Sequence, residues 1–585
     1  MKDDGYVRMD VEGSALRPRR RRGPGRRSLA LLAAALVLFT IGFVVVSPSL
    51  EQAPAEDGIH LTTWPKVIED GGDLVVFWPE TARVNKNDYL TLSCGPQQGT
   101  DDYLARKNVT EFDATLNSVR FSELFMMRCD YSVEYFRYHK GKKSYESLTK
   151  IQVGMRESFN TPKHGHLALT TQENAMAVMY NSASSRTPEA RYGTDPTNLD
   201  HHATGTSTTY KASDMCQAPA TTVAQRLFRD PGFMHTAIMT DLTPETTYFY
   251  QYGNDVDGWS KVAQFRSRPK KDTKTTKFIA YADMGVDTAP AAQSNAVRVY
   301  SDVVGDGFDS FLLHFGDISY ARGEGSVWDK FFHIIEPYAT RVPYMVSVGN
   351  HEHDYTAGGE HDPSGEAGSA GNGFHPHWGN YGEDSLGECS VPMYHRWHVP
   401  ATGNSLFWYS FDYGGIHVVQ MSSEHNFTRG SNQYEWLERD LASVNRIESP
   451  WIVLTAHRMM YSTQKDIDVD IHLGERFRAE VEPLLMKYRV NLVLVGHQHS
   501  YERSCPVYQG ECVRDGKSAP VHFVVGSAGF GLSDNGFTSK YGNWSLVHAD
   551  EYGHLRVATT ATQMHIEFIS NRNGIVYDEV TLEPY

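Results

Sequence analysis

The stretch Val490-Asn-Leu-Val-Leu-Val-Gly-His-Gln-His-Ser-Tyr-Glu-Arg503 decides the fold of the C-terminal half of this 585-residue chain. Its first six residues are almost all apolar. Such a run is typical of a strand that is buried on both faces of a parallel sheet. The run ends in a glycine and two histidines, His497 and His499. Because ligands of α/β sheets collect outside the carboxyl ends of the strands, this ending predicts a binding site at a sheet edge.

Four more apolar runs upstream share this pattern, and helix-length amphipathic stretches lie between them. The runs occupy 278–282, 310–315, 343–348 and 450–455. They lead directly into Asp283-Met-Gly285, Gly316-Asp-Ile-Ser-Tyr320, Gly349-Asn-His-Glu352 and Ala456-His457. One Asp-x-Gly or one histidine usually marks only a turn or a surface residue, but five polar clusters at five strand ends predict one site. We therefore expect an α/β domain over 276–585, built from βαβ units, with the site at a largely parallel sheet edge.

These five blocks together resemble the signature blocks of the purple acid phosphatases, a family of metallophosphoesterases. Two further markers distinguish this family from other metallophosphoesterases, namely Tyr320, three residues after Asp317, and Tyr501-Glu-Arg503 after the last histidine. The resemblance covers residues from roughly 160 to 585 and implies the metallophosphoesterase sandwich fold. The additional sequence before it is similar to that of the larger, plant-type members.

The resemblance also implies two metal ions and their ligands. The family pattern places Fe³⁺ on Asp283, Asp317, Tyr320 and His499. It places a second, divalent ion (Zn²⁺, Mn²⁺ or Fe²⁺) on Asp317, Asn350, His457 and His497, with Asp317 bridging the two ions. The first set is rich in anionic oxygen and suits a hard trivalent ion, whereas the second consists mostly of neutral imidazole and amide.

The activity implied by this resemblance is that of an acid phosphatase, which hydrolyses phosphate monoesters by in-line attack of metal-bound hydroxide. His351 follows the ligand Asn350 and is expected to hydrogen-bond the phosphoryl oxygens or protonate the leaving group. The family also has a second active-site histidine between His457 and His497. His472 is the only histidine in that interval, although its spacing from His457 is longer than usual. Ala282 replaces the glycine that usually begins the first block, and no ligand is missing.

The regions before the α/β domain have a different pattern. Short alternating runs such as Asp73-Leu-Val-Val-Phe-Trp78 are separated by polar turns, which predicts a β-sandwich over 59–160. The same style continues over 163–270, where Leu242-Thr-Pro-Glu-Thr-Thr-Tyr-Phe-Tyr250 looks like the turn and aromatic strand of a fibronectin-III-like domain. The glycine-rich segment 357–387 is too irregular for a core element, and we expect a long loop over the sheet edge.

The N-terminus predicts a membrane anchor. Leu29 to Val46 is an 18-residue stretch without a charged side chain, and nine Lys and Arg residues precede it within 1–27. As a helix it would span about 27 Å, which is enough to cross a thin bilayer. The positive-inside rule then predicts a basic cytoplasmic tail over 1–27, a transmembrane signal anchor over 28–47, and a lumenal or extracellular body, as in a type II single-pass protein. The alternative is a cleaved signal peptide and a secreted protein.

Cysteine content and charge agree with an exported protein. The chain has six cysteines, none in a C-x-x-C pair, and Cys505 and Cys512 bracket a short loop that favours a disulfide. N-glycosylation sequons occur at Asn108, Asn426 and Asn543. The formal net charge of −16 argues against a general nucleic-acid binder, which would carry a basic surface. The resemblance implies small-molecule phosphate esters as partners, and a homodimer is possible.

Two alternatives to a phosphomonoesterase stay open. The same metal site would serve a phosphodiesterase or nucleotide pyrophosphatase, because the difference would lie in the 357–387 loop and the neighbouring domain. The chain could also be an inactive cell-surface binding ectodomain, whose expected signature is a missing ligand. No Gly-x-Ser-x-Gly elbow is present, which disfavours a serine hydrolase.

Overall fold

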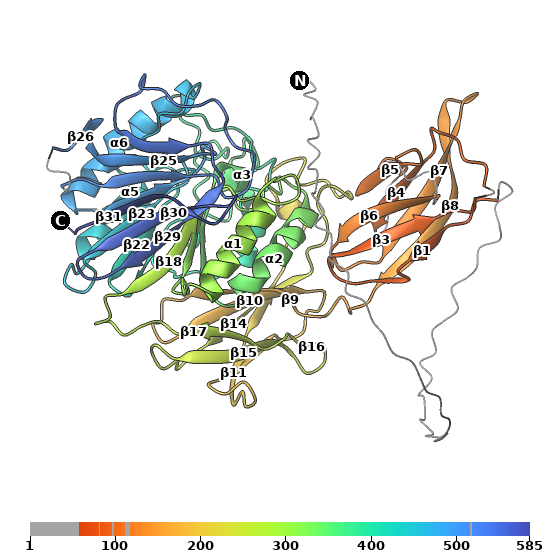
Figure 1. Cartoon of the computed structure of the whole chain (residues 1–585), viewed down its shortest axis with the longest axis horizontal. Coiled ribbons are helices and arrows are strands. Elements are labelled where there is room, and N and C mark those ends of the chain that lie inside the picture. Colours follow the sequence, from red (N-terminus) through yellow and green to blue (C-terminus); the bar gives the residue numbers. More distant parts are fainter. Residues whose placement is uncertain (1–57, 81, 96–98, 112–116, 515–517, 585) are drawn as a thin grey trace, which may run out of the picture. The chain divides into compact units, whose positions relative to one another are not determined.

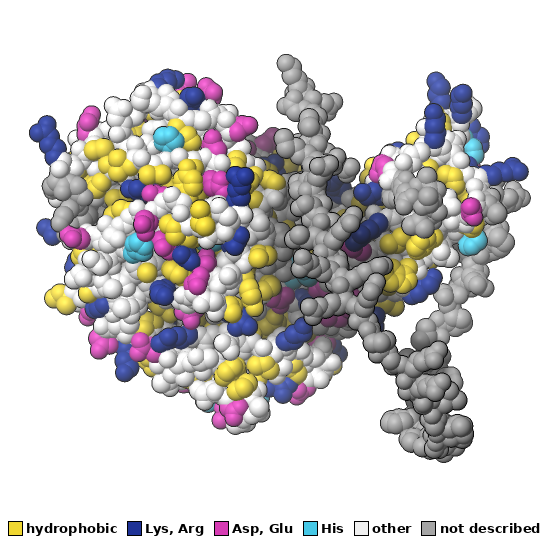
Figure 2. Space-filling model, in the orientation of Figure 1, with side chains coloured by type: hydrophobic (Ala, Val, Ile, Leu, Met, Phe, Trp, Pro, Cys, Tyr) yellow, Lys and Arg dark blue, Asp and Glu magenta, His cyan; other side chains and the backbone are white. Residues whose placement is uncertain are grey.

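The computed structural model describes residues 58–80, 82–95, 99–111, 117–514 and 518–584 of the chain. In chain order it contains two all-β parts followed by a mixed α/β domain (Figure 1). On the face drawn in Figure 2, the Lys and Arg side chains are interspersed with Asp and Glu side chains over the α/β domain.

The first all-β part consists of two sheets with strand orders β1-β3-β6 and β2-β8-β7-β4-β5. Its strands are β1 (Thr62–Trp64), β2 (Val67–Ile68), β3 (Gly72–Phe77), β4 (Tyr89–Cys94), β5 (Ala105–Asn108), β6 (Ser118–Leu124), β7 (Tyr131–His139) and β8 (Ser144–Met155). Alternate residues of β3 are buried, as the period-two pattern predicts. A disulfide joins Cys94 to Cys129 within this part.

The second all-β part also has two sheets, with orders β13-β14-β10-β9 and β12-β11-β15-β16, and β17 pairs with β15. Its strands are β9 (Lys163–Leu169), β10 (Met176–Ser182), β11 (Glu189–Gly193), β12 (His201–Thr204), β13 (Thr206–Thr208), β14 (Phe233–Met239), β15 (Thr247–Asn254), β16 (Gly258–Trp259) and β17 (Ala263–Arg266). The expected aromatic strand is β15, in which Tyr248, Tyr250 and Tyr252 are buried. A short 3-10 helix, η1 (Ala212–Asp214), follows β13.

The α/β domain is built on two mixed sheets. The first has the order β20-β19-β18-β29-β30-β31. Its strands are β18 (Thr276–Tyr281), β19 (Leu312–Phe315), β20 (Tyr344–Ser347), β29 (Gly553–Thr559), β30 (Met564–Ser570) and β31 (Val576–Leu582). The second has the order β21-β22-β23-β24-β27-β25-β26, and β28 pairs with β25. Its strands are β21 (Tyr409–Tyr413), β22 (Ile416–Gln420), β23 (Trp451–Thr455), β24 (Leu492–Val495), β25 (Tyr501–Tyr508), β26 (Glu511–Cys512), β27 (Val521–Val525) and β28 (Ser545–Ala549).

The five apolar runs are strands, but they do not share one sheet. β18, β19 and β20 are parallel neighbours in the first sheet, and β23 and β24 are parallel neighbours in the second. The prediction of one largely parallel edge is therefore corrected to two mixed sheets whose parallel strands end beside each other. The two sheets belong to one hydrophobic core, in which Phe311 packs edge-on against Phe411 at 5.4 Å.

Helices pack on the sheets and join the strands. α1 (Ala292–Val304) and α2 (Gly325–Ala339) lie side by side (Figure 1). The remaining helices are α3 (Asn350–His353), η2 (Gly359–His361), α4 (Val391–Arg396), α5 (Asn432–Ser443) and α6 (Asp468–Lys487). Ser431 caps α5, because its side chain accepts a hydrogen bond from the Tyr434 amide. The segment 357–387 contains only η2, as expected for a long loop.

The predicted membrane topology needs correction. Within the described ranges, no helix is long and apolar enough to cross a bilayer. α6 has 20 residues, but it begins with Asp468 and Asp470 and is amphipathic rather than uniformly apolar. The predicted tail over 1–27 and anchor over 28–47 lie outside the described residues. The assignment as a type II single-pass protein therefore finds no support.

Candidate metal centre

The predicted ligands stand at turns with unusual backbone conformation. Asp283, Asp317, Tyr320 and His497 have φ values of 59°, 52°, 56° and 68°, in the left-handed region that non-glycine residues avoid. Each such residue costs roughly 1–2 kcal/mol relative to ordinary backbone. Strained residues of this kind cluster at functional sites, where the surrounding structure holds them in place.

Two glycines are needed because the chain segments approach closely. Gly316 has φ of 94°, and a Cβ added to it would lie 2.4 Å from Nδ1 of His457. A Cβ on Gly496 would lie 2.3 Å from Oδ2 of Asp283. A side chain at either position would displace a site residue. The alanine at position 282 is accommodated, because its own φ lies outside the left-handed region.

One set of side chains, which we call the Tyr320 group, consists of Asp283, Tyr320 and His499. The Tyr320 hydroxyl lies 3.1 Å from Oδ1 of Asp283 and 2.8 Å from Nε2 of His499. His499 Nε2 is 3.3 Å from the same Asp283 oxygen. The Tyr320 ring stacks on Phe530 at 3.8 Å between centroids, which fixes the direction of the hydroxyl. Asp283, Asp317 and His499 each offer a ligand atom within 4.8 Å of the others.

The other set, the Asn350 group, consists of Asn350, His457 and His497. Oδ1 of Asn350 lies 2.9 Å from Nε2 of His457 and 3.0 Å from Nδ1 of His497. Asp317 joins the two groups, since its Oδ1 lies 3.3 Å from His457 Nε2 while its carboxylate also belongs to the cluster around Asp283. The structure thus brings all seven predicted ligands together, in the two sets that the sequence predicted. We call these residues the candidate metal centre.

Hydrogen bonds outside the two groups direct donor atoms inward. His457 Nδ1 lies 3.2 Å from the Phe315 carbonyl, and His499 Nδ1 lies 2.6 Å from the Gly531 carbonyl. A carbonyl only accepts, so both Nδ1 atoms carry a proton, and the Nε2 atom of each neutral imidazole would offer its lone pair to a metal ion. The Asn350 amide donates from Nδ2 to Asp384 at 3.1 Å, which turns Oδ1 toward the two histidines. Lone pairs that face one another in this way need a cation, so the residues fit a pair of metal ions.

Electrostatics at the site also favour positive charge. Burial opposes a charge on His457, but the carboxylates of Asp317 and Asp283 outweigh it and raise the pKa of His457 to about 10. Burial would raise the pKa of Asp317, yet His457 and His351 lower it well below its ordinary value. Burial, reinforced by Asp283 and Asp317, raises the pKa of Tyr320 well above its ordinary value. The carboxylates therefore hold cationic partners in a buried environment.

His351 lies at the rim of this centre, as predicted. Its Nε2 is 3.7 Å from Oδ2 of Asp317, and its backbone amide donates to Oδ1 of Asp317 at 3.0 Å. The Arg322 guanidinium contacts both ring nitrogens at 3.1 Å. Burial lowers the pKa of His351, and Arg322 adds to this effect while Asp317 opposes it. An imidazole and a guanidinium therefore stand beside the carboxylate that joins the two groups.

The structure does not bring His472 to the site. His472 is exposed on α6, and in the described part of the chain no hydrogen bond or ion pair joins it to a predicted ligand. The same helix instead presents Asp470, whose Oδ1 lies 3.4 Å from Nε2 of His497. Two residues along a helix correspond to about 200° of rotation, so His472 and Asp470 point to different sides. The sequence analysis did not predict Asp470, although its position two residues before His472 could have indicated it.

Glu352 is a second residue that sequence reasoning missed. Its buried carboxylate accepts hydrogen bonds from the backbone amides of Asp317 at 2.8 Å, Ile318 at 2.8 Å and Gly349 at 3.1 Å. Burial and the nearby Asp317 raise the pKa of Glu352 to about 8. Glu352 thus ties the turn after β19 to the turn after β20. Its position directly after Asn350 and His351 in the sequence could have been used to predict it as a site residue.

Comparison with known protein families gives three matches along the chain. The family model for the purple acid phosphatase N-terminal domain matches residues 162–267. The model for calcineurin-like phosphoesterases matches 276–501, which contains all seven predicted ligands. The model for the iron/zinc purple acid phosphatase-like C-terminal region matches 519–579. Iron and zinc are thus suggested by the family, and no comparison supports the homodimer.

Similar proteins of known sequence come from plants and animals. A protein of Arabidopsis thaliana named "Probable inactive purple acid phosphatase 9" is 30% identical over 94% of this chain and 89% of its own length. A Hordeum vulgare protein named "Nucleotide pyrophosphatase/phosphodiesterase" is 30% identical over 55% of this chain and 88% of its own length. Human "Acid phosphatase type 7" is 27% identical over 74% of this chain and 92% of its own length.

The fold agrees with these matches. The solved structure of a purple acid phosphatase from yellow lupin (Lupinus luteus) seeds superposes with a TM-score of 0.76, at 24% identity, over 90% of this chain and 96% of the lupin chain. That structure supports the fold of the all-β and α/β parts, including the calcineurin-like arrangement of the two mixed sheets. The matched domains and the extent of the similar sequences together show that this chain belongs to the purple acid phosphatase family.

Proposed function

We propose that this chain is an active acid phosphatase that hydrolyses phosphate monoesters at a dinuclear metal centre. The observation that carries the proposal is the convergence of unshared lone pairs in the Tyr320 and Asn350 groups. An inactive ectodomain would have no need for seven side chains oriented in this way, five of them buried, at the cost of four left-handed residues.

The Tyr320 group with Asp317 would hold Fe³⁺, because it offers carboxylate and phenol oxygens, and the Asn350 group with Asp317 would hold a divalent ion such as Zn²⁺. When bound, such ions supply Lewis acidity and lower the pKa of water. The chain's own residues have separate tasks. His351, backed by Arg322 at 3.1 Å, is placed to donate a hydrogen bond to a phosphoryl oxygen or a proton to the leaving alkoxide. Arg322 adds positive charge that attracts the phosphate group.

A phosphodiesterase or pyrophosphatase activity is the second candidate, and Asp470 favours the diesterase. A monoester carries two negative charges near neutral pH, whereas a diester carries one. The Asp470 carboxylate lies 3.4 Å from His497, whereas the sequence analysis expected His472 in the active site. A carboxylate there repels the doubly charged substrate more strongly. The barley relative named as a nucleotide pyrophosphatase/phosphodiesterase gives this alternative additional weight.

The test compares hydrolysis of p-nitrophenyl phosphate, bis(p-nitrophenyl) phosphate and a nucleoside diphosphate by protein reconstituted with iron and zinc. We expect the highest kcat/KM with the monoester, and a loss of at least about 10³-fold in Asp317→Asn, because that variant weakens both metal positions. Preference for the diester or the diphosphate would transfer the assignment to the second candidate. Metal-loaded protein that hydrolyses none of the three substrates would contradict both.

A further inference from the structure

A second group of metal-binding side chains is buried away from the candidate metal centre. It consists of His353 at the end of α3, Asp362 in the segment 357–387, and His425 in the loop after β22, and we call it the His353 cluster. One ligand atom from each residue lies within 4.8 Å of the other two. Their exposed fractions are 2%, 7% and 2%, so all three side chains are buried.

Asp362 faces His353 without a close hydrogen bond between them. His353 Nδ1 lies 3.1 Å from the Ser390 hydroxyl, and His353 Nε2 faces Oδ2 of Asp362 at 3.9 Å. This separation is too long for a direct hydrogen bond between the imidazole and the carboxylate. A cation bound to both atoms would fit between them.

His425 adds a ring nitrogen without a partner. Its Nδ1 lies 2.8 Å from Ser422 Oγ, while its buried Nε2 finds no hydrogen-bond partner among the described residues. The rings of His353 and His425 lie 4.0 Å apart between centroids with a 31° tilt. A buried polar atom without a partner is unfavourable, so a ligand for this nitrogen would be stabilising.

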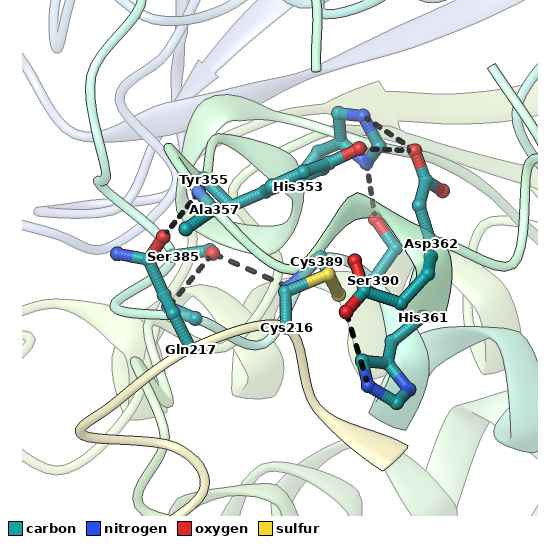
Figure 3. Close-up of a disulfide and its surroundings, with 12 residues drawn as sticks. Cys216, Gln217, His353, Tyr355, Ala357, His361, Asp362, Ser385, Cys389 and Ser390 are labelled. Atoms are coloured by element: carbon teal, nitrogen blue, oxygen red, sulfur yellow. Dashed lines mark hydrogen bonds and ion pairs between the residues drawn. A yellow bond between two sulfur atoms is a disulfide. The ribbon is translucent and has the colours of Figure 1, made fainter. Parts of the chain in front are cut away.

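Asp362 is held in the orientation that a metal ligand requires. The Tyr355 hydroxyl donates to its Oδ2 at 2.7 Å (Figure 3). The Ser364 amide donates to its Oδ1 at 2.8 Å. Burial lowers the pKa of both His353 and His425, which keeps the two imidazoles neutral. The cluster therefore has one negative charge and two neutral nitrogen donors in a buried space.

We propose that the His353 cluster is a third metal site, which binds a divalent cation of the zinc type. Two imidazoles and one carboxylate are a donor set that Zn²⁺ favours, and serine and tyrosine hydroxyls hold the outer atoms of these ligands. Zinc bonds of about 2.0–2.1 Å place tetrahedral ligand atoms roughly 3.3 Å apart. The 3.9 Å between His353 Nε2 and Asp362 Oδ2 would therefore shorten by about 0.6 Å on zinc binding. A water molecule or the Tyr355 hydroxyl completes the coordination.

The cation has a structural role in this position. It joins the segment 357–387 to α3, the helix that also carries Asn350 and His351. The disulfide between Cys216 and Cys389 fixes the chain directly before Ser390, which holds His353 (Figure 3). The loop is therefore attached on two sides of the same cluster, and the cation would hold α3 in register with it.

The test measures zinc per chain by elemental analysis in the intact protein, produced with zinc and purified without chelator. The variants are His425→Gln, which removes one ligand, and Asp362→Asn, which keeps the shape of the carboxylate. His235→Gln is the matched control, because His235 is 2% exposed and lies between the hydroxyls of Ser182 and Ser207. We expect one zinc fewer per chain in each of the two cluster variants, and no change in the control.

The difference between variants is informative whether or not the candidate metal centre is loaded, so failure of the proposed function would not hide it. Equal zinc content in wild type, His425→Gln and Asp362→Asn would overturn the third site. Should both variants fail to fold, an anomalous difference map of wild-type crystals at the zinc edge decides the matter. A peak between His353, Asp362 and His425 supports the proposal, and no peak there refutes it.

Discussion

At the residue scale, the candidate metal centre depends on which atom of each side chain points inward. Four predicted ligands each have a hydrogen-bond partner on the side that faces away from the centre. The partners are the Phe315 and Gly531 carbonyls and the carboxylates of Asp384 and Asp470. These outer contacts select the ligand atom and restrict rotation of the ring or amide. Loss of such a contact typically costs about 10- to 100-fold in metal affinity or activity.

Asp470 and His472 give a direct comparison on one helix. We expect Asp470→Asn to weaken binding of the divalent ion and to lower kcat/KM by about 10- to 100-fold, because His497 loses a charged acceptor for its Nε2–H. His472→Gln is expected to leave both quantities within about twofold, since His472 is exposed. The measurements are metal titration and steady-state hydrolysis. The opposite ranking of the two variants would restore His472 as the active-site residue of α6.

The sequence predicted the seven ligands but not these outer contacts, for a physical reason. Each ligand follows a buried strand by one or two residues or stands in a short turn, so local pattern locates it. The contact of Asp470 with His497 joins residues 27 positions apart and depends on how α6 packs. His472 was selected by residue type within an interval, which carries no information about the direction of a helical side chain.

At the element scale, buried charges connect strands to helices. His417 on β22 lies 2.9 Å from Asp412 on β21 and 2.9 Å from Asp440 on α5. Burial opposes the charged imidazole, but the hydrogen bonds that the imidazole donates to both carboxylates outweigh it and raise the pKa of His417 to about 9. The protonated histidine thus links the edge of the second sheet to the helix that covers it.

This link should make stability depend on pH in a defined direction. A pKa raised from 6.5 to about 9 in the folded state adds stability that is complete below pH 6.5 and is lost as the pH rises through 9. The upper bound is about 3 kcal/mol. We expect His417→Gln to lower the melting temperature strongly at pH 6 and only weakly at pH 10. An equal decrease at both pH values would show that the charge of His417 contributes nothing.

The disulfides allow a second prediction at this scale. Cys216–Cys389 closes a loop with a sequence separation of 173, whereas Cys505–Cys512 has a separation of 7. In the chain-entropy account these loops correspond to about 5 and about 2 kcal/mol of stabilisation. We expect the Cys216→Ser/Cys389→Ser variant to melt well below the Cys505→Ser/Cys512→Ser variant in a thermal unfolding assay. Equal melting temperatures would contradict the entropic reading.

The sequence was informative about elements where local pattern decides them. The five apolar runs are strands, and the Cys505–Cys512 disulfide is confirmed. The division into two mixed sheets could not be predicted, because an apolar run indicates that a strand is buried but not which strand pairs with it. β29, β30 and β31 complete the first sheet from the C-terminal end of the chain, and only tertiary pairing places them there.

At the scale of the whole molecule, a buried ion pair joins the all-β parts to the α/β domain. Arg128 of the first part donates to both carboxylate oxygens of Asp329 on α2 at 2.8 Å, and to Asn181 on β10 at 2.7 Å. The side chains of Arg128 and Asp329 are 8% and 5% exposed. Bidentate geometry and burial make this the kind of pair whose disruption is costly.

We expect Asp329→Asn to destabilise the protein by about 3–5 kcal/mol, because it leaves the Arg128 charge buried without its counter-ion. The matched control is Asp468→Asn, which breaks the pair with Lys540 whose side chains are 61% and 60% exposed. That control should leave the stability close to that of the wild type, because solvent screens an exposed ion pair. Limited proteolysis and thermal unfolding measure both variants, and similar behaviour of the two would contradict a structural role for Arg128.

The most direct measurement of the central claim is the visible absorption spectrum of iron-loaded protein, before and after Tyr320→Phe. Phenylalanine keeps the stacking on Phe530 and removes only the hydroxyl, which lies 2.8 Å from His499. The account predicts a violet tyrosinate-to-iron band in the wild type and its loss in the variant. Iron-loaded wild-type protein without this band, or a band that persists in Tyr320→Phe, would contradict the ligand assignment on which the proposed function rests.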